Sequence, residues 1–255
     1  MSLPHPDWTR DELFDGALAI WQRKKGYRFG LDSLLLATDL PPLPPRAVVV
    51  ELGAGQGAVA LTIAHQHLDW EVIALERQES LLELLRQNVA ENSLSNIEIL
   101  AGDLRDHRSL LRAHSADLVV ANPPYFSPGA RRPSTDTERA AARHELFGGL
   151  DDFIRASAYT LKQRGWLQII VPPLRLPDAL KAADATDLAL SNLRFYHSTE
   201  TSPAYLVELR WRRGGAADLE IRPPLFVYED EDPEESGPSR RYRPEVAARL
   251  QREGR

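Results

Sequence analysis

The sequence predicts an α/β fold with a doubly wound, mostly parallel sheet. Apolar runs of strand length alternate along the chain with segments in which leucines recur at helical spacing, a pattern typical of parallel strands joined by helical crossovers. A glycine-rich turn at residues 53–57 joins the first such run to the first helical segment. Toward the C-terminus a short Ser/Thr/Pro turn separates two strand-like runs. This favours an antiparallel hairpin, because a parallel crossover needs a longer connection.

Each element has its own signal. A proline-rich connector at 40–46 precedes the first strand. The helix at 80–92 carries leucines on one face, and the helix at 150–165 begins with aspartates and ends at a glycine. Seven strands are expected, at 47–52, 71–76, 97–103, 116–121, 166–172, 193–198 and 204–212. The helices are expected at 58–68, 80–92, 150–165 and 174–185.

Composition excludes several classes of protein. The 255 residues are 43% hydrophobic and 27% charged, an ordinary balance for a globular chain. Cysteine is absent and the histidines show no ligand spacing, so we expect neither disulfides nor a metal site. No apolar run approaches the roughly 20 residues of a membrane span, and the first residues lack a signal core. We therefore expect a cytoplasmic protein with no membrane partner.

The glycine turn predicts a site for a nucleoside-containing cofactor. Gly53, Gly55 and Gly57 lie between a strand and a helix, where glycine lets a ligand approach the backbone and the helix N-terminus. Glu76 ends the next strand, 19 residues after Gly57, and its carboxylate can accept hydrogen bonds from both ribose hydroxyls. The glycine pattern alone is weak, and its strand context together with Glu76 carries the prediction.

Glu51 favours one class of cofactor over another. It stands just before the glycines, where a carboxylate is unfavourable beside the pyrophosphate of a nicotinamide dinucleotide. The sulfonium and ammonium groups of S-adenosyl-L-methionine are cationic and suit this carboxylate. Asp103, at the end of the third strand, can accept a hydrogen bond from an adenine amino group, and N-capping of a helix explains it equally well.

The fourth strand ends in Asn122-Pro123-Pro124-Tyr125, which predicts a catalytic site. A simple turn would explain the prolines but not the amide before them and the aromatic ring after them. These groups suit a planar exocyclic amine as the substrate. Such an amine is a poor nucleophile, because its lone pair is delocalised into the ring. The Asn122 oxygen and the Pro123 carbonyl can accept its two N–H groups and turn the lone pair toward an electrophile, with Pro124 keeping the backbone rigid. Tyr125 can stack on the flat face of the base.

Three motifs and one acidic residue carry a resemblance to a known class of enzymes. Glu-Leu-Gly-Ala-Gly-Gln-Gly at 51–57, Glu76, Ala-Gly-Asp-Leu at 101–104 and Asn-Pro-Pro-Tyr at 122–125 resemble, in this order, the motifs of class I S-adenosylmethionine-dependent methyltransferases. The last motif is similar to that of enzymes which methylate amino or amide nitrogens. The resemblance implies a Rossmann-like fold and S-adenosyl-L-methionine as the cofactor. It also implies a cofactor site that includes Asp103, Leu104 and Asn122.

Flanking segments resemble a narrower family. Residues 24–40, 142–145 and 223–250 are similar to segments of the bacterial tRNA(Val) (adenine-37-N6)-methyltransferase family. This resemblance implies methyl transfer to the N6 amine of an adenine in RNA, next to the anticodon of a tRNA. An acidic, proline-rich stretch at 229–238 departs from the pattern of the family.

The chain is expected to have three parts. Residues 1–45 form an N-terminal segment that covers the cofactor cleft, residues 46–213 form the cofactor-binding core, and residues 214–255 form a C-terminal extension. In the first part, Tyr27 and Phe29 are placed to contact the adenine or methionine moiety of the cofactor. Arg28, between them, is placed to contact its carboxylate.

The net charge of −6 argues mildly against a nucleic-acid partner, but basic residues gather in two segments that suit RNA phosphates. That the RNA is a tRNA is what the family resemblance implies. Both segments should border the cleft, where their side chains would contact phosphates. The residues concerned are Arg23, Lys24, Lys25, Arg131, Arg132, Arg139 and Arg143. We expect the protein to be a monomer or a weak dimer.

Three other functions remain open. A protein glutamine N5-methyltransferase of the release-factor type also has an Asn-Pro-Pro-Tyr motif, but such enzymes carry a sizeable helical domain before the cofactor domain. A non-catalytic module that binds S-adenosylmethionine or RNA would not need Asn122 and Tyr125 together. A nicotinamide oxidoreductase would need a hydride-relay pair beside the strands, and the sequence offers none that is convincing.

Overall fold

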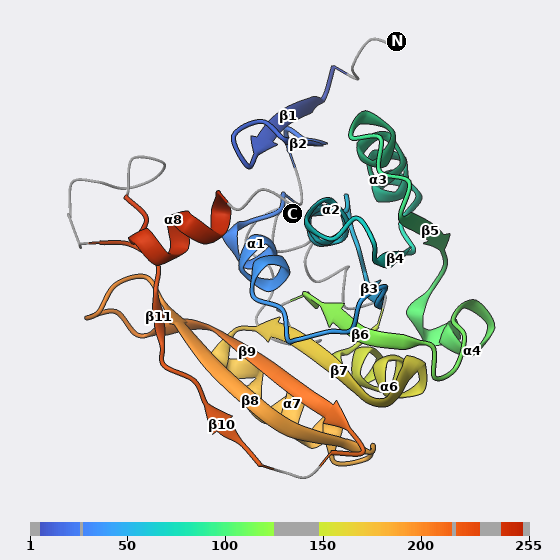
Figure 1. Cartoon of the computed structure of the whole chain (residues 1–255), viewed down its shortest axis with the longest axis vertical. Helices are drawn as coiled ribbons and strands as arrows, with labels where there is room; N and C mark the ends of the chain where they lie inside the picture. The colour runs from blue at the N-terminus through green and yellow to red at the C-terminus, as the bar shows by residue number, and fades with distance from the viewer. Residues whose placement is uncertain (1–5, 26–27, 125–147, 216–217, 230–240, 252–255) are drawn as a thin grey trace.

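A computed structural model describes residues 6–25, 28–124, 148–215, 218–229 and 241–251 (Figure 1). The centre of the molecule is one twisted sheet. Its longer strands are β3 (Val48–Leu52), β4 (Glu71–Glu76), β5 (Ile97–Ala101), β6 (Ala116–Ala121), β7 (Leu161–Val171), β8 (Leu188–His197) and β9 (Ala204–Arg213). In the described residues two short strands, β10 (Glu220–Ile221) and β11 (Leu225–Phe226), join its edge.

The strand order is β10-β8-β9-β7-β6-β3-β4-β5, with β11 also paired to β8. Strands β5, β4, β3, β6 and β7 are parallel, and β9 runs antiparallel to both β7 and β8. The predicted class I, Rossmann-like sheet and its antiparallel hairpin are thus confirmed. Seven strands were expected in this sheet, whereas the described residues form nine. The C-terminal segment adds β10 and β11 in parallel to β8.

Helices cover both faces of the sheet, and each face has its own hydrophobic core. One core contains side chains of α1 (Leu31–Thr38), α2 (Ala58–Gln66) and α3 (Glu79–Glu91), and the other contains those of α6 (Leu150–Thr160) and α7 (Leu176–Ala183). The strands between them are apolar on both sides, which explains why continuous apolar runs marked them in the sequence. Figure 1 shows the two helical layers on either side of β3, β6 and β7.

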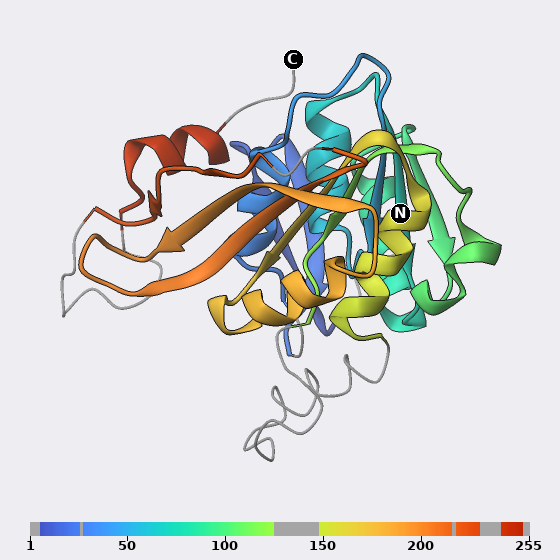
Figure 2. The same ribbon diagram turned by 90° about the horizontal axis from the view of Figure 1, so that it is seen from below.

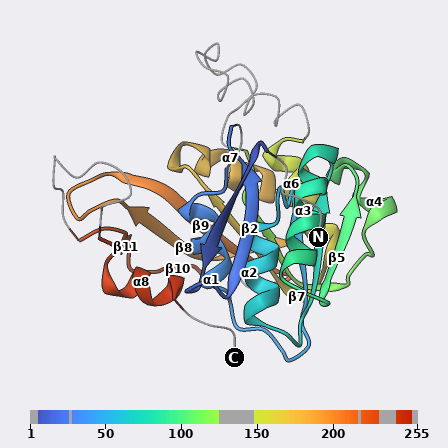
Figure 3. The same ribbon diagram turned by 90° about the horizontal axis from the view of Figure 1, so that it is seen from above.

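A hairpin of β1 (Trp8–Leu13) and β2 (Leu18–Arg23) precedes the sheet and was not predicted. It lies against α2 and α3 (Figure 3). The side chain of Asn88 exchanges hydrogen bonds with the backbone of Trp21, and that of Asn92 does so with Ala19. Each asparagine thus pairs with the hairpin as another strand would. The Asp-Gly turn between two alternating segments was the signal available in the sequence.

Helix α6 ends earlier than predicted. We expected it to continue to Gly165, but it ends at Thr160 and β7 begins at the next residue. Leu161 is fully buried and pairs with Ala116 of β6, and Arg164 adopts a left-handed φ of 63° where the strand register shifts. Pairing with β6, which is a tertiary interaction, therefore determines the strand conformation of residues 161–165. Their local sequence is equally compatible with a helix.

A buried ion network fastens the C-terminal segment to the rest of the fold. Its centre is Asp39, the residue that ends α1. Four arginines form ion pairs with the Asp39 carboxylate: Arg194, Arg210, Arg222 and Arg249. Burial alone would raise the pKa of Asp39, but the positive charge of Arg210 and the hydrogen bond from Arg222 outweigh it and hold the pKa well below its usual range. Arg249 comes from α8 (Pro244–Leu250), so the network links α8, β8 and β9 to α1.

Candidate active site

The predicted site residues converge at the carboxyl ends of β3, β4 and β6, where a parallel sheet places its ligands. A pocket there encloses about 250 Å³ of empty space, including solvent at its mouth. The residues that line it include Phe29, Ser33, Glu51, Gly53, Gln56 and Asn122. Four of these, Phe29, Glu51, Gly53 and Asn122, were predicted from the sequence as site residues.

The glycine turn between β3 and α2 requires glycine at specific positions. Gly53, Gly55 and Gly57 all have positive φ angles, of 73°, 59° and 93°. A Cβ atom on Gly57 would lie 2.3 Å from Leu61 and 2.4 Å from Leu85, so the turn also packs too closely for a side chain. The N–H groups of Gly53 and Ala54 donate to the carbonyl of Leu75, which fixes the turn to the end of β4.

Glu76 connects the glycine turn to the start of α3. The side chain is buried, and one carboxylate oxygen accepts a hydrogen bond from the Gly55 N–H over 2.8 Å. The other oxygen accepts from the N–H groups of Arg77 and Gln78, over 2.8 and 2.7 Å. A carboxylate has about four acceptor positions, so Glu76 can hold the turn and still accept from a ligand hydroxyl.

Glu51 is buried at the base of the pocket, and it also caps α2. Its carboxylate accepts a hydrogen bond from the Ala60 N–H over 2.8 Å. Burial raises the pKa of Glu51 to about 8, and the nearby charge of Glu76 adds to the effect, while the bond from Ala60 opposes it. A buried carboxylate of this kind favours a cation beside it, because a positive charge offsets the cost of ionising it.

Asn122 is oriented by a residue far away in the sequence. Its side-chain N–H₂ group donates to a carboxylate oxygen of Asp32 over 2.9 Å, and it lies 3.4 Å from the Ser33 hydroxyl. The amide oxygen of Asn122 is buried and has no hydrogen-bond partner in the described part of the chain. This acceptor therefore stands available at the pocket. Asp32 lies in the first turn of α1, which begins after Gly30 without a side-chain cap.

Gln56 is a pocket residue that the sequence analysis missed. It is 1% exposed, and within the described ranges neither its side-chain oxygen nor its side-chain nitrogen has a hydrogen-bond partner. Its backbone carbonyl accepts from Asn88, which fixes the chain at this point. A buried amide without partners is costly unless a ligand or water satisfies it. The available signal was its position between two glycines of the turn.

Three predicted cofactor contacts have protein partners. Asp103 caps the short helix η1 (Leu104–Asp106) and forms ion pairs with Arg77 and Arg105. Leu104 is buried in the core on the α6 and α7 face of the sheet. Arg28 donates to Thr9, Asp11 and the carbonyl of Arg23 and so lies against the β1–β2 hairpin. The N-capping explanation of Asp103 is thus realised, and a contact with adenine would have to share that carboxylate.

The remaining predicted residues lie at the end of the hairpin, after β6, or outside the described residues. Arg23, Lys24 and Lys25 lie at the end of the hairpin, where the Lys24 ammonium donates to the carbonyl of Pro6 over 2.6 Å. Pro123 is buried and Pro124 half-buried after β6. Six predicted residues lie outside the described residues: Tyr27, Tyr125, Arg131, Arg132, Arg139 and Arg143.

Two classes of feature are absent from the described part of the chain. No cluster of three His, Asp or Glu side chains could hold a metal ion there. Within the same ranges, no helix has both the length and the apolar character needed to cross a bilayer.

Comparison with known proteins agrees with the geometry. Residues 28–185, which include the pocket and the helices on both sides of the sheet, match the methyltransferase small domain family. The chain therefore belongs to the methyltransferase small domain family. S-adenosyl-L-methionine is the cofactor that goes with this methyltransferase domain, in agreement with the prediction made from Glu51 and the glycine turn.

Curated relatives of the methyltransferase domain include proteins of two kinds. A protein of Porphyromonas gingivalis called tRNA1(Val) (adenine(37)-N6)-methyltransferase is 29% identical over 74% of this chain and 76% of its own length. One of the same name in Bacteroides fragilis is 28% identical over 60% of this chain, and the match spans 63% of the relative. A release factor glutamine methyltransferase of Mycolicibacterium smegmatis is 40% identical, but over 47% of this chain and 42% of its own length.

Solved structures agree on the fold of the methyltransferase domain. A predicted O-methyltransferase of Agrobacterium tumefaciens superposes with a TM-score of 0.68 and 22% identity, covering 86% of this chain and 95% of that one. The TYW2 protein of M. jannaschii, solved in complex with AdoMet, superposes with a TM-score of 0.55 and 18% identity, covering 84% and 90%. At these identities the similarity is one of fold.

The residues in and next to the pocket fit S-adenosyl-L-methionine in three ways. Glu51 supplies a carboxylate suited to a cationic group. Gln56 supplies a buried amide that lacks partners in the described residues, and a polar ligand would satisfy it. Glu76 stands where a ribose would find an acceptor, beside backbone that approaches a ligand without intervening side chains. When bound, the cofactor would supply a methyl group on a sulfonium as the electrophile.

Proposed function

We propose that this protein transfers a methyl group from S-adenosyl-L-methionine to the exocyclic N6 amine of an adenine in RNA, and that the RNA is a tRNA methylated next to its anticodon. The observation that carries the proposal is the Asn122 amide oxygen, which is buried at the pocket without a hydrogen-bond partner in the described residues. A buried acceptor of this kind suits a substrate that brings an N–H group.

The site residues would act on that amine by positioning and electrostatics. The Asn122 oxygen would accept one N–H and the Pro123 carbonyl the other, so that the lone pair of the nitrogen points at the methyl carbon. As the N–C bond forms and the C–S bond breaks, positive charge develops on the nitrogen, and both acceptors stabilise it. The extra proton leaves the nitrogen after methyl transfer. Tyr125 would stack on the adenine, which must first be splayed out of its neighbours.

Two features support RNA over protein as the substrate. The relatives called tRNA1(Val) (adenine(37)-N6)-methyltransferase align over as much as 76% of their length, whereas the release-factor relative from M. smegmatis aligns over 42% of its own. The second feature is the group of basic residues at the end of the hairpin, where Lys24 and Lys25 are exposed. These could contact phosphates.

Methylation of a glutamine side chain in a release factor is the second candidate. The 40% identity over the aligned 121 residues of the M. smegmatis protein favours it, and an amide nitrogen needs the same two acceptors as an amine. The distinction between the two substrates therefore depends on the surface around the pocket and not on Asn122.

One experiment separates the candidates. The purified chain would be incubated with radiolabelled S-adenosyl-L-methionine and, in parallel, with total tRNA, ribosomal RNA and a protein extract. We expect label in tRNA that nucleoside analysis identifies as N6-methyladenosine, and none with Asn122→Ala. Label in protein glutamine instead would overturn the proposal in favour of the release-factor alternative.

A further inference from the structure

Three large apolar side chains are exposed at the edge of the sheet where the parallel strands end and where Asn122 lies. Leu174 is 86% exposed, Tyr205 is 37% exposed and Tyr242 is 39% exposed. Single exposed apolar side chains are common on protein surfaces. These three gather at one edge of the sheet, and their relation to Asn122 follows from the strand register.

The register places Leu174 and Tyr205 beyond the strand ends that flank Asn122. Strand β6 ends at Ala121, level with Ile169 of β7. Strand β7 ends at Val171, three residues before Leu174, and Val171 pairs with Val207 of β9, two residues after Tyr205. Two strand spacings, roughly 10 Å in all, separate Asn122 from Tyr205 across the sheet, and the register offsets the two by three residues, roughly another 10 Å, along the strands. The two residues therefore lie roughly 14 Å apart.

Tyr242 joins this surface from the C-terminal segment. It forms a β-bridge with Tyr228, and the two rings stack with centroids 5.4 Å apart and planes 17° apart. Burial raises the pKa of Tyr205, and the nearby Tyr228, Asp32 and Tyr242 add to the shift. Tyr205 is thus near both the stacked tyrosines and Asp32, the residue that holds Asn122. Figures 1 and 2 show the β8–β9 turn and α8 on the same side of the molecule.

The chemistry of the surface suits a nucleobase. Tyrosine rings present flat faces on which any base can stack, and the exposed Leu174, in the segment that packs next to β9, adds apolar surface at the same edge of the sheet. The Arg243 guanidinium lies 5.3 Å from the Phe226 ring and pairs with Glu200, so cationic and anionic groups border the surface without dominating it. Stacking, and not phosphate contact, is therefore the interaction that this surface offers.

We propose that Leu174, Tyr205 and Tyr242 form a stacking surface for an unpaired nucleobase next to the target adenine, which rests on the proposed function in RNA. Enzymes that act on a splayed-out base read its neighbours through contacts just outside the reaction pocket. A surface roughly 14 Å from Asn122 lies within reach of a neighbouring base that is splayed away from the target. Binding of a flanking base here would hold the RNA while the target base enters the pocket.

The test uses the full chain and an RNA stem-loop with the anticodon-loop sequence of the best tRNA substrate. The base on either side of the target adenine is replaced in turn by 2-aminopurine, whose fluorescence falls on stacking. We expect wild-type protein to quench one of the two probes. Tyr205→Ala, Leu174→Ala and Tyr242→Ala should each abolish that quenching and lower kcat/KM for RNA by roughly 5- to 150-fold, the range expected for loss of one stacked base.

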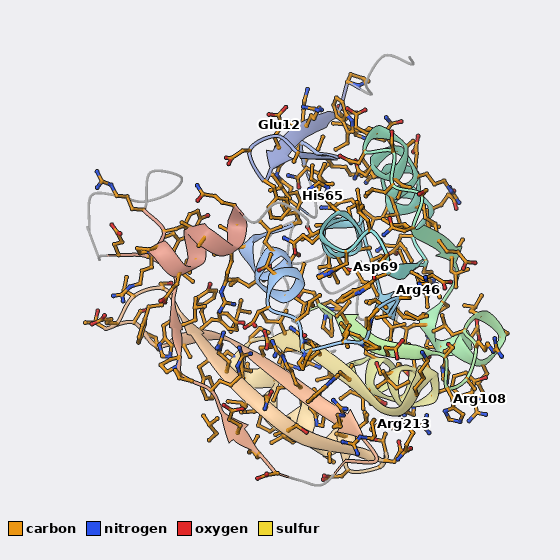
Figure 4. All side chains as sticks on the ribbon, in the orientation of Figure 1. Glu12, Arg46, His65, Asp69, Arg108 and Arg213 are labelled. Atoms are coloured by element: carbon orange, nitrogen blue, oxygen red, sulfur yellow. The ribbon has the colours of Figure 1, made fainter. Side chains whose placement is uncertain are left out.

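Two controls separate stacking from a general loss of structure. Tyr205→Phe keeps the ring and should retain both quenching and kcat/KM. Leu68→Ala removes an exposed leucine, 67% exposed, from the loop between α2 and β4 at the opposite edge of the sheet, and should change neither. Figure 4 shows the neighbouring Asp69 beside Arg46, well apart from α8. Cofactor affinity, measured by calorimetry, should stay within twofold of wild type in every variant.

The outcomes are distinct. If wild-type protein methylates RNA but the three alanine variants keep quenching and kcat/KM within twofold, the stacking surface is wrong and the proposed function stands. If wild-type protein methylates protein and no RNA, the proposed function is wrong and the stacking surface fails with it.

Discussion

The Asn122 amide donates to the Asp32 carboxylate over 2.9 Å, and this bond turns the Asn122 oxygen toward the pocket. Ninety residues separate the two in the sequence. An anionic partner on the N–H₂ side also increases the electron density on the amide oxygen. Asp32 is therefore a positioning residue: it fixes the acceptor that would contact the substrate amine and strengthens it.

Replacing Asp32 by alanine should lower kcat by roughly 10- to 100-fold, as for loss of a hydrogen bond to a charged group. The KM for S-adenosyl-L-methionine should change little. Asp32→Asn keeps an acceptor oxygen and should recover part of the rate. A double-mutant cycle checks the mechanism, because Asp32→Ala should cost almost nothing when Asn122 is already alanine. Additive losses in that cycle would show that Asp32 acts independently of Asn122.

Cofactor affinity should depend on pH through Glu51. Burial raises the pKa of this carboxyl to about 8, and a cationic ligand favours its ionised form. Below pH 8 binding should therefore release a proton. As the pH rises toward 8, Kd for the cofactor should fall by up to tenfold per pH unit, and above pH 8 it should become constant. Calorimetry in buffers of different ionisation enthalpy measures the released proton. Glu51→Gln should remove the pH dependence. An unchanged proton release in that variant would assign it to another group.

The same shift has a consequence for the stability of the protein without ligand. The unfolded chain loses the Glu51 proton near the ordinary value of 4.5, whereas the folded chain keeps it up to about pH 8. The folded state binds more protons in this window, so its free energy of unfolding should decrease as the pH rises from 4.5 to 8. Glu51→Gln should flatten this decrease in urea titrations.

Replacing Glu76 by alanine should weaken cofactor binding by about 1–3 kcal/mol. The variant removes the acceptor for a ribose and also leaves the Gly55 N–H without its partner. Glu79→Ala is a matched control, because Glu79 is an acid of the same helix region whose side chain is 77% exposed. Calorimetry on both folded variants checks the prediction, and equal affinities would remove Glu76 from the cofactor site.

Asp39→Ala should destabilise the fold by roughly 3–5 kcal/mol, because it leaves buried arginines without their shared anion. The stabilisation depends on the ionised carboxylate, whose pKa the arginines hold below the ordinary 3.8. It should therefore be present above that pH and be lost as the pH falls below it. Asp187→Ala breaks a more exposed pair with Arg213 and should cost about 1 kcal/mol or less. Thermal unfolding of both variants measures the difference.

Sequence patterns predicted the parts of this protein in which local and tertiary preferences agree. Strand β4 was predicted at its observed bounds, because its central run Val72–Leu75 is apolar on both faces and a glutamate stands at each end. Residues 161–165 were assigned to a helix, because only their pairing with β6 makes them a strand. The glycine turn and Asn122 were recognised from local motifs. The role of Asp32 was not, since it depends on how α1 packs across the sheet.

Helix α1 has a carboxylate at each end: Asp32 orients Asn122, and Asp39 is held by arginines from β8, β9 and the C-terminal segment. Because α1 connects the two carboxylates, a change to the C-terminal helix α8 can alter the position of Asn122 at the reaction centre. Removing α8 would take Arg249 from Asp39 and loosen the helix that carries Asp32. Affinity tags and domain fusions are therefore better placed away from α8, even though α8 itself contributes no side chain to the pocket lining.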